Sequence, residues 1–359
     1  MTKKSVLVPV AILVILFLSL AACSHRETGD TAGKDIEEWP IGEEDHMDEE
    51  TIGYSIWTTY WDTENLTGEL ETIKDRIDNI CYFAAYFNKD RQPFIPKETM
   101  ESFEKVEKLY GSMKHKSYLT FVNDLILEDN TSSLKDVDLL YALFETDRSM
   151  DNHIRDILRM TMEEGFDGIE IDYEAIRQDM VLWQLFIEFV EKLYEAAAEK
   201  DILVRVLLEP NAPLDEIELP EGPEYVMMCY NLHGQGTRPG PKANRRFLES
   251  LVRKTRTLPG KVNFALATGG FDFDGNGTVK SITEKQAVEL LALFEKSPER
   301  EEESQALFFD YIDNGGIEHR VWYADSKTIN YWIDILQQAG NHDISLWRLG
   351  GNLNLKSIK

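Results

Sequence analysis

The chain has 359 residues, of which 43% are hydrophobic and 29% charged, and its formal net charge at pH 7 is -27. This acidity argues against a nucleic-acid partner, because phosphates are bound by Lys and Arg, and against direct adhesion to anionic lipid head groups. The length is compatible with one large α/β barrel domain.

The N-terminus has the features of an export signal. A basic MTKK start precedes an uninterrupted apolar run over residues 5–22, which ends at Cys23. This pattern is typical of a secretory signal peptide, although a run of about 20 apolar residues can also anchor a protein in the bilayer. The stretch LAAC, which ends at Cys23, resembles a bacterial lipobox. We therefore expect a lipoprotein signal peptide over residues 1–22, export, and a membrane anchor through a lipid on Cys23.

Residues 23–50 are predicted to form a flexible tether. This stretch is acidic, polar and nearly free of apolar side chains, so it cannot bury enough surface to offset its chain entropy. Residues 51–359 are then expected to form the folded domain, as a monomer. Cys81 and Cys229 lie inside apolar runs, and we expect free, buried thiols rather than a disulfide.

Short apolar runs alternate with helical patterns along this domain. The clearest helical pattern covers 181–200, where apolar residues recur every three or four positions. The predicted strands are 51–61, 79–87, 117–123, 168–174, 202–209, 225–231, 262–268 and 344–349. Eight strands with intervening helices predict a closed parallel (β/α)8 TIM barrel of the α/β class. A doubly wound open sheet is the alternative, but no G-x-G-x-x-G follows the first strand.

One segment interrupts this alternation between the seventh and eighth strands. Residues 306–325 contain two strand-like runs on either side of Asp-Asn-Gly-Gly. Asn and Gly tolerate the positive φ angles of hairpin turns. We therefore expect a small inserted β-hairpin on the barrel rim and not a separate domain.

The fourth predicted strand carries three acidic residues on one face. Glu170, Asp172 and Glu174 alternate with Ile169, Ile171 and Tyr173, so the acids are expected to point into the barrel. Glu174 lies nearest the carboxyl end, where barrel active sites form. Buried like charges raise one another's pKa, so at least one carboxyl should stay protonated near neutral pH, as a general acid requires.

The alternative interpretation of this strand is structural. Inward-facing acids can be paired with Arg or Lys and remain inert, and Arg205 is one possible partner. Three stacked acids, however, require more basic partners than the sequence readily supplies. Perturbed carboxyls in a cleft therefore favour a functional site.

These residues resemble a known family. The run from Asp167 to Glu174 is similar to the D-x-x-D-x-D-x-E motif of glycoside hydrolase family 18, which lies on the fourth strand of a TIM barrel. Met228 to Asn231 resembles the M-x-Y-D/N motif of that family, and Trp347 stands where the family has a tryptophan on strand eight. The run from Gly316 to Tyr323 resembles the branch that contains spore-cortex peptidoglycan N-acetylglucosaminidases.

The resemblance implies hydrolysis of β-linked N-acetylglucosamine in peptidoglycan or chitin-like glycans, with no cofactor or metal. It implies a retaining mechanism in which the acetamido group of the substrate is the nucleophile. Glu174 would protonate the glycosidic oxygen, Asp172 would orient the acetamido nitrogen, and Tyr230 would hydrogen-bond the acetamido oxygen. The residues expected to bind the sugar are Glu170, Asn231, Trp347, Trp57 and Asn123.

Two departures from the family pattern keep alternatives open. Glu170 replaces the usual Asp, and the strand-three S-x-G-G pattern of chitinases is replaced by LTFVND, with Asn123 at the strand end. A catalytically silent, carbohydrate-binding relative on the same barrel is therefore a second hypothesis. A solute-binding lipoprotein of another fold is a third, but it would not explain the acidic strand. The DFDGNG run at 272–277 lacks the twelfth-position Glu of a calcium loop, so we expect a polar turn there.

Overall fold

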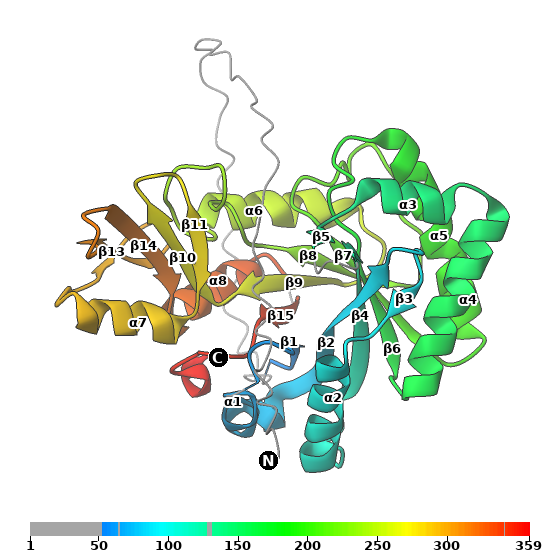
Figure 1. Cartoon of the computed structure of the whole chain (residues 1–359), viewed down its shortest axis with the longest axis horizontal. Helices are drawn as coiled ribbons and strands as arrows, with labels where there is room; N and C mark the ends of the chain where they lie inside the picture. Colours follow the sequence, from blue (N-terminus) through cyan, green and yellow to red (C-terminus); the bar gives the residue numbers. More distant parts are fainter. Residues whose placement is uncertain (1–51, 64, 128–130, 341) are drawn as a thin grey trace, which may run out of the picture. The chain divides into compact units, whose positions relative to one another are not determined.

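The computed structural model describes residues 52–63, 65–127, 131–340 and 342–359. Eight parallel strands pair side by side and close into a barrel, because β2 pairs with both β1 and β4 and β1 pairs with β15 (Figure 1). The barrel strands are β1 (Tyr54–Thr59), β2 (Ile77–Asn88), β4 (Lys116–Ile126), β6 (Gly168–Asp172), β7 (Leu203–Leu208), β8 (Glu224–Met228), β9 (Val262–Ala267) and β15 (Asp343–Trp347). The predicted TIM barrel and its eight strands are confirmed.

Helices connect most of these strands. They are α1 (Leu66–Ile73), α2 (Lys97–Tyr110), α3 (Val137–Phe144), α4 (Asp147–Glu164), α5 (Met180–Ala198), α6 (Arg245–Lys254) and α8 (Ser326–Gln338), with short 3-10 turns η1 (Lys74–Arg76), η2 (Thr255–Thr257) and η3 (Leu355–Ser357). The connection from β7 to β8, residues 209–223, contains no helix although the structure describes all of it. Short strands β3 (Pro93–Phe94) and β5 (Ser132–Ser133) pair with the extended ends of β2 and β4.

The alternation predicted for the acidic strand is present in β6. Ile169 and Ile171 are buried between the strand and the helices, and Tyr173 packs on Phe189 of α5 with ring centroids 5.9 Å apart. The Tyr173 hydroxyl is 2.8 Å from Nε2 of His153 on α4. Burial lowers the pKa of His153 to about 3, so this imidazole is neutral. The outer face of β6 is thus held by an uncharged aromatic layer.

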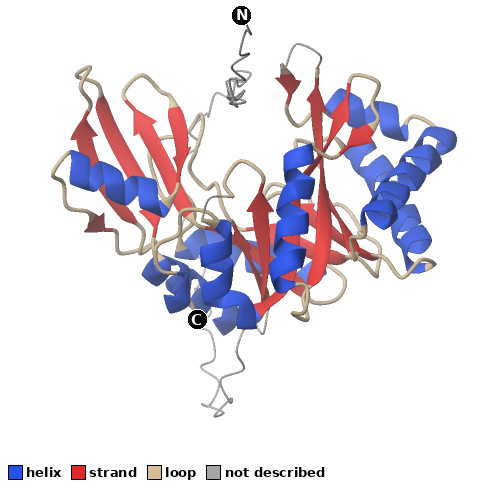
Figure 2. Ribbon diagram, turned by 60° about the horizontal axis from the view of Figure 1, so that its bottom comes forward, coloured by secondary structure: helices blue, strands red, loops and turns tan. Residues whose placement is uncertain are grey.

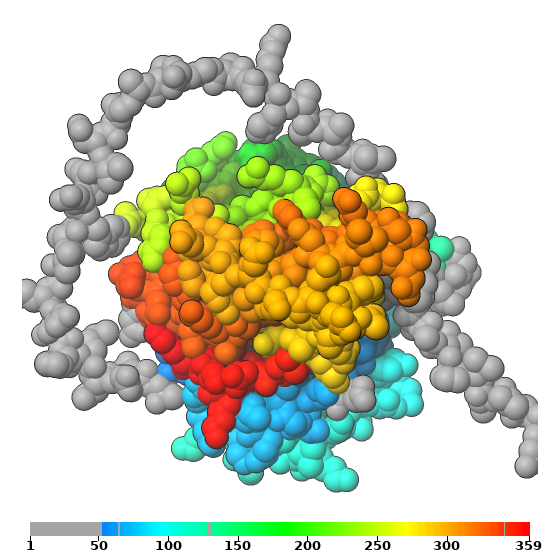
Figure 3. All heavy atoms as spheres, turned by 90° about the vertical axis from the view of Figure 1, so that its left-hand side faces the viewer, coloured from blue at the N-terminus to red at the C-terminus, as the bar shows by residue number. Residues whose placement is uncertain are grey.

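The insertion between β9 and β15 is larger than the predicted hairpin. The hairpin exists as β13 (Leu307–Ile312) and β14 (Glu318–Ala324), but it belongs to a five-stranded antiparallel sheet of order β11-β10-β14-β13-β12 (Figure 2). The other strands are β10 (Gly269–Asp274), β11 (Val279–Ile282) and β12 (Glu299–Arg300), and helix α7 (Glu284–Leu293) packs on one face. Residues of this insertion form the yellow to orange surface in Figure 3.

Two tight turns shape this inserted sheet. The Asp313 carboxylate accepts from the backbone N–H groups of Gly315 and Ile317, each at 2.8 Å. In the β10–β11 turn, the Asp274 carboxylate accepts from Asn276 and Thr278 at 2.9 and 2.7 Å. The run at 272–277 therefore includes the polar turn that was predicted.

The predicted signal peptide, the tether and the lipidated Cys23 lie outside the described residues, so the predicted boundaries 1–22, 23–50 and 51–359 stay predictions. Within the described ranges, none of the helices combines the length and the apolar composition needed to cross a bilayer. Cys81 and Cys229 are both buried free thiols, as predicted.

Candidate active site

The innermost acid of β6 is part of a buried ion pair. Glu170 is 0% exposed, and its carboxylate accepts from the indole Nε1 of Trp57 at 2.6 Å and from the hydroxyl of Thr120 at 2.7 Å. The Arg205 guanidinium of β7 donates to its other oxygen at 3.1 Å. Glu170 therefore cannot contact a sugar, and the prediction that it binds substrate is wrong. Its role is to hold the barrel interior together.

Arg205 extends this network across the barrel. It is fully buried and donates to the hydroxyl of Ser55 at 2.7 Å, to the carboxylate of Glu224 at 3.1 Å and to the hydroxyl of Ser345 at 3.2 Å. These partners come from β1, β8 and β15. A buried charge is tolerated only when it is paired and hydrogen-bonded in this way.

Asp172 lies one layer closer to the mouth, and it has no basic partner in direct contact. Its side chain is 6% exposed, and its Oδ1 has no hydrogen-bond partner in the described part of the chain. Burial raises the pKa of Asp172 well above its ordinary value, and the neighbouring Glu174 raises it further. Burial therefore disfavours the ionised form of this carboxyl, and one of its oxygens is left unpaired.

Glu174 stands at the mouth, two residues beyond the end of β6. Asn123, at the carboxyl-terminal part of β4, fixes its backbone from both sides, because its side chain accepts from Glu174 N at 2.9 Å and donates to Glu174 O at 3.1 Å. The Glu174 carboxylate is ion-paired with the ammonium of Lys135, which lies between β5 and α3. Asn123 is 1% exposed and positions Glu174, so the prediction that it binds substrate is wrong.

Two further carboxyls complete the cluster. Burial raises the pKa of Asp124 to about 6, while the backbone N–H of Lys135, which donates to it at 2.7 Å, lowers this pKa. Glu209, just after β7, accepts from the backbone N–H of Ala175 at 2.8 Å. Burial first, and then the charge of Glu174, raise the pKa of Glu209.

These neighbours were only partly visible in the sequence. Asp124 lies near the carboxyl end of β4 and Glu209 directly follows β7, which are positions where acidic residues at a barrel mouth are expected. Lys135 lies outside any strand or helix and has a positive φ of 52°, and its sequence context carries no comparable signal. The expectation that the three acids lack basic partners is therefore corrected, because Arg205 pairs with Glu170 and Lys135 with Glu174.

The aromatic residues close the other side of the mouth. Tyr230 follows β8 and is buried in the barrel-interior cluster with Trp57 and Met228. Burial raises its pKa, and the charges of Asp172 and Glu174 raise it further, so its hydroxyl remains a donor beside the two acids. Trp347 is half-buried at the end of β15, with its ring centroid 5.8 Å from that of Trp57.

Two predicted sugar contacts differ in their exposure. Trp57 is 0% exposed and donates its indole N–H to Glu170, so the prediction that it binds substrate is wrong. Asn231, next to Tyr230, has a positive φ of 62°. It is exposed, so its side chain is available at the mouth. Tyr230, Asn231 and Trp347 remain candidates for substrate contact, together with Asp172 and Glu174.

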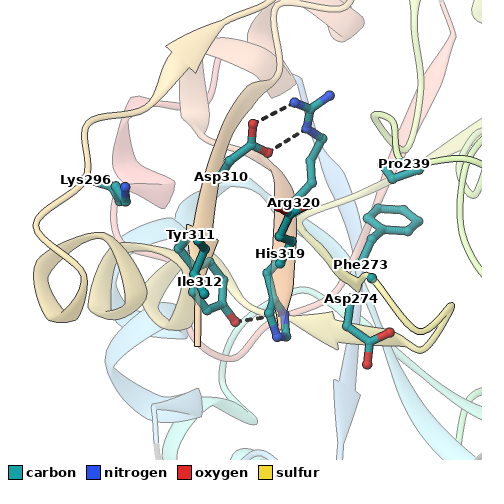
Figure 4. A pocket seen from close by; sticks show the side chains of 11 residues that line it. Pro239, Phe273, Asp274, Lys296, Asp310, Tyr311, Ile312, His319 and Arg320 are labelled. Atoms are coloured by element: carbon teal, nitrogen blue, oxygen red, sulfur yellow. Dashed lines mark hydrogen bonds and ion pairs between the residues drawn. The ribbon is translucent and has the colours of Figure 1, made fainter. Parts of the chain in front are cut away.

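A hollow lies on the inserted sheet, away from the acidic cluster. It has a volume of about 520 Å³ and is lined by residues that include Asp310, Tyr311, His319 and Arg320 (Figure 4). His319 Nδ1 is 2.9 Å from Asp272 and 3.1 Å from the Tyr311 hydroxyl, and Arg320 is paired with Asp310 at 2.6 Å. These contacts tie β10, β13 and β14 together, so the Gly316–Tyr323 run contributes to the insertion and not to the acidic site.

No protein-family model matches the chain. The chain is 24% identical over 210 residues to the uncharacterized glycosylase YvbX of Bacillus subtilis (strain 168). This match covers 54% of the chain and 60% of YvbX. The chain is 22% identical over 319 residues to the cortical fragment-lytic enzyme of Bacillus cereus. This match covers 84% of the chain and 71% of that enzyme. The crystal structure of a chitinase from Chromobacterium violaceum ATCC 12472 matches with a TM-score of 0.70 at 16% identity, over 85% of this chain and 97% of that chain. These comparisons confirm the predicted likeness to cortex-lytic enzymes and chitinases.

Proposed function

From this likeness and from the acidic cluster, we propose that the protein is a glycosidase that hydrolyses glycans containing β-linked N-acetylglucosamine. The observation that carries the proposal is Glu174 at the barrel mouth, with Asp172 buried behind it and Tyr230 close to both. The names of the relatives point to spore-cortex fragments and chitin as substrate classes, and both contain N-acetylglucosamine.

The chemistry follows from the three side chains. Glu174 protonates the glycosidic oxygen as the bond to the leaving sugar breaks, and general acid catalysis of this kind contributes about 10²–10⁴-fold. The free Oδ1 of Asp172 accepts the acetamido N–H and so orients the acetamido oxygen towards the anomeric carbon. The Tyr230 hydroxyl donates to that oxygen. Glu174, now a carboxylate, then deprotonates the water that completes hydrolysis, which retains the anomeric configuration.

A catalytically silent, carbohydrate-binding protein is the second candidate function. The observation that favours it is the ion pair between Lys135 and Glu174, because the Lys135 ammonium occupies the carboxyl that hydrolysis would require. Glu170 in place of the family's usual Asp points the same way. In this candidate, the mouth binds the sugar and no bond is broken.

One experiment separates the two functions. A panel of peptidoglycan fragments, chitin oligomers and N-glycans is incubated with the parent protein, with Glu174→Gln and with Glu191→Gln, and the products are identified by mass. Glu191 is exposed on α5 and serves as the matched control. Hydrolysis by the parent and the control but not by Glu174→Gln supports the glycosidase. Binding without hydrolysis by all three proteins supports the lectin.

We also propose that the protein is an exported monomer, tethered to the cell membrane through a lipid on Cys23. The support is the basic start, the apolar run and the lipobox-like LAAC in the sequence. An acidic spacer after Cys23 would hold the barrel away from the anionic membrane surface.

A further inference from the structure

Lys242 lies in the connection between β8 and α6, next to two candidates for substrate contact. Its backbone carbonyl accepts from the N–H of Leu232 at 2.9 Å, and Leu232 directly follows Asn231. Its ammonium donates to the carbonyl of Thr268 at 2.9 Å, and the N–H of Thr268 donates in turn to the carbonyl of Trp347 at 2.7 Å. These bonds place Lys242 at the mouth, between the ends of β8 and β9.

The ammonium of Lys242 is a buried cation without an anion. In the part of the chain that the structure describes, no carboxylate forms an ion pair with it, and beyond Thr268 it lies 5.0 Å from the ring centroid of Phe271. Burial lowers the pKa of Lys242 to about 7, and the positive charge of Arg348 lowers it further. Arg348 is itself paired with Asp62 at 2.8 Å. Lysine is almost never fully buried unless it is paired, so the anion that Lys242 lacks has to come from elsewhere.

The position of Lys242 allows a ligand to supply this anion. Arg205, deep in the barrel interior, is already paired with Glu170. Lys242 instead lies at the mouth and is 8% exposed, close to the 6% of Asp172 and the 9% of Tyr230, which are candidates for substrate contact. Tyr230 follows β8, and Lys242 belongs to the connection that begins there. A sugar in contact with Tyr230 therefore lies against the connection that carries Lys242.

We propose that Lys242 binds a carboxylate on the glycan and so makes the mouth selective for acidic glycans over neutral ones. The ammonium has N–H donors left for such a group, because it carries three and the structure pairs one with Thr268. Peptidoglycan bears carboxylates on the lactyl groups or peptides of its N-acetylmuramic acid units, whereas chitin oligomers are neutral. The inference rests on the proposed glycosidase function and narrows its substrate class. Lys242 determines specificity and takes no part in breaking the glycosidic bond.

Peptidoglycan tetrasaccharides that differ in one group test this role. Their lactyl carboxylate is left free, converted to a primary amide, or extended by alanine, which moves the carboxylate outward. For the parent, kcat/KM should be about 10–100-fold higher for one of the two acids than for the amide, because a hydrogen bond to a charged group contributes on this scale. Preference for the free acid identifies the lactyl group as the source, and preference for the alanyl form identifies the peptide. Lys242→Met should bring both acids to the level of the amide.

Two further variants guard against a loss of folding. Lys242→Gln keeps a donor for the Thr268 carbonyl but carries no charge, and it should lose the preference for the acids as Lys242→Met does. Lys108→Met, at an exposed position of α2, is the matched control and should keep the preference of the parent. Thermal melts verify that each protein is folded. Equal kcat/KM values of the parent for the acids and the amide would overturn the proposal, and so would a preference that survives in either folded Lys242 variant.

Calorimetric titration with the same tetrasaccharides separates this inference from the glycosidase function. If the parent binds an acid more tightly than the amide and Lys242→Gln does not, the carboxylate site is supported even when no glycan is hydrolysed, and the glycosidase function is what fails. If the parent hydrolyses and binds the acids and the amide equally well, the carboxylate site is refuted and the glycosidase function stands. If the parent neither binds nor hydrolyses any of the three, both proposals are refuted.

Discussion

Glu170→Gln is predicted to destabilise the barrel although it changes one atom. Trp57 and Thr120 donate to one oxygen of Glu170, at 2.6 and 2.7 Å, and Cys81 and Arg205 donate to the other, at 3.3 and 3.1 Å. All four partners are donors, and only a carboxylate accepts at both oxygens. The amide NH₂ of Gln would face either the indole of Trp57 or the guanidinium of Arg205, and neither of these N–H donors can rotate away.

The magnitude follows from the burial of the pair. Glu170 and Arg205 are both 0% exposed, and removing one partner of such a pair costs about 3–5 kcal/mol because the other charge is left uncompensated. Glu224 remains close to Arg205 at 3.1 Å, which places the expected loss near the lower end of this range. At about 2–4 °C per kcal/mol for a large domain, the melting temperature should fall by roughly 6–12 °C.

Urea unfolding of the parent, Glu170→Gln and Glu191→Gln measures this loss. The midpoint should fall for Glu170→Gln with an unchanged slope, whereas the exposed control should stay within about 0.5 kcal/mol of the parent. Glu170→Asp keeps two accepting oxygens and should lose less. A loss below about 1 kcal/mol for Glu170→Gln would refute the role of the four converging donors.

Three further predictions concern the mouth and the N-terminus. Burial raises the pKa of Asp124 from its ordinary value to about 6, so Asp124 contributes stability below about pH 4 that is lost as the pH rises to about 6. Asp124→Asn should therefore match the parent in thermal melts at pH 4 and exceed it at pH 7 by about 1–3 kcal/mol; equal melts at pH 7 would contradict this. If the acetamido group attacks, the β-anomer forms first and a thiazoline analogue of N-acetylglucosamine should inhibit, whereas NMR detection of the α-anomer would exclude this mechanism. Cys23→Ser should release the protein from membranes or leave its signal uncleaved, and a variant that fractionates and labels with lipid like the parent would rule out the anchor.

In the inserted sheet, the sequence could predict the local hairpin but not the pairing between strands that are distant in the chain. The β13–β14 hairpin was predictable because Asp313 to Gly316 has strong turn chemistry close to two apolar runs. The pairing of β10 with β14 was not, since Gly270 and Tyr323 lie far apart in sequence and pair only after folding. The sequence therefore predicted the hairpin and missed the sheet around it.

The site residues divide in the same way. The period of two along β6 sufficed to place Glu170 and Asp172 on one inward face, with Glu174 following beyond the strand end, because alternate side chains of a strand point to opposite sides. The same period could not show that Trp57 and Asn123 are buried, because their burial depends on the side chains that neighbouring strands pack over them.

The sequence by itself thus determined the barrel class, the acidic strand and the order of its carboxyls towards the mouth. Only the tertiary structure decided their partners. Arg205 reaches Glu170 from a neighbouring strand and Lys135 reaches Glu174 from a loop, and no local pattern specifies which acid each one meets. Electrostatic interactions depend on distance and burial in space. Folding alone therefore places Glu170 in a buried ion pair, leaves the Oδ1 of Asp172 unpaired among the described residues, and puts Glu174 at the mouth.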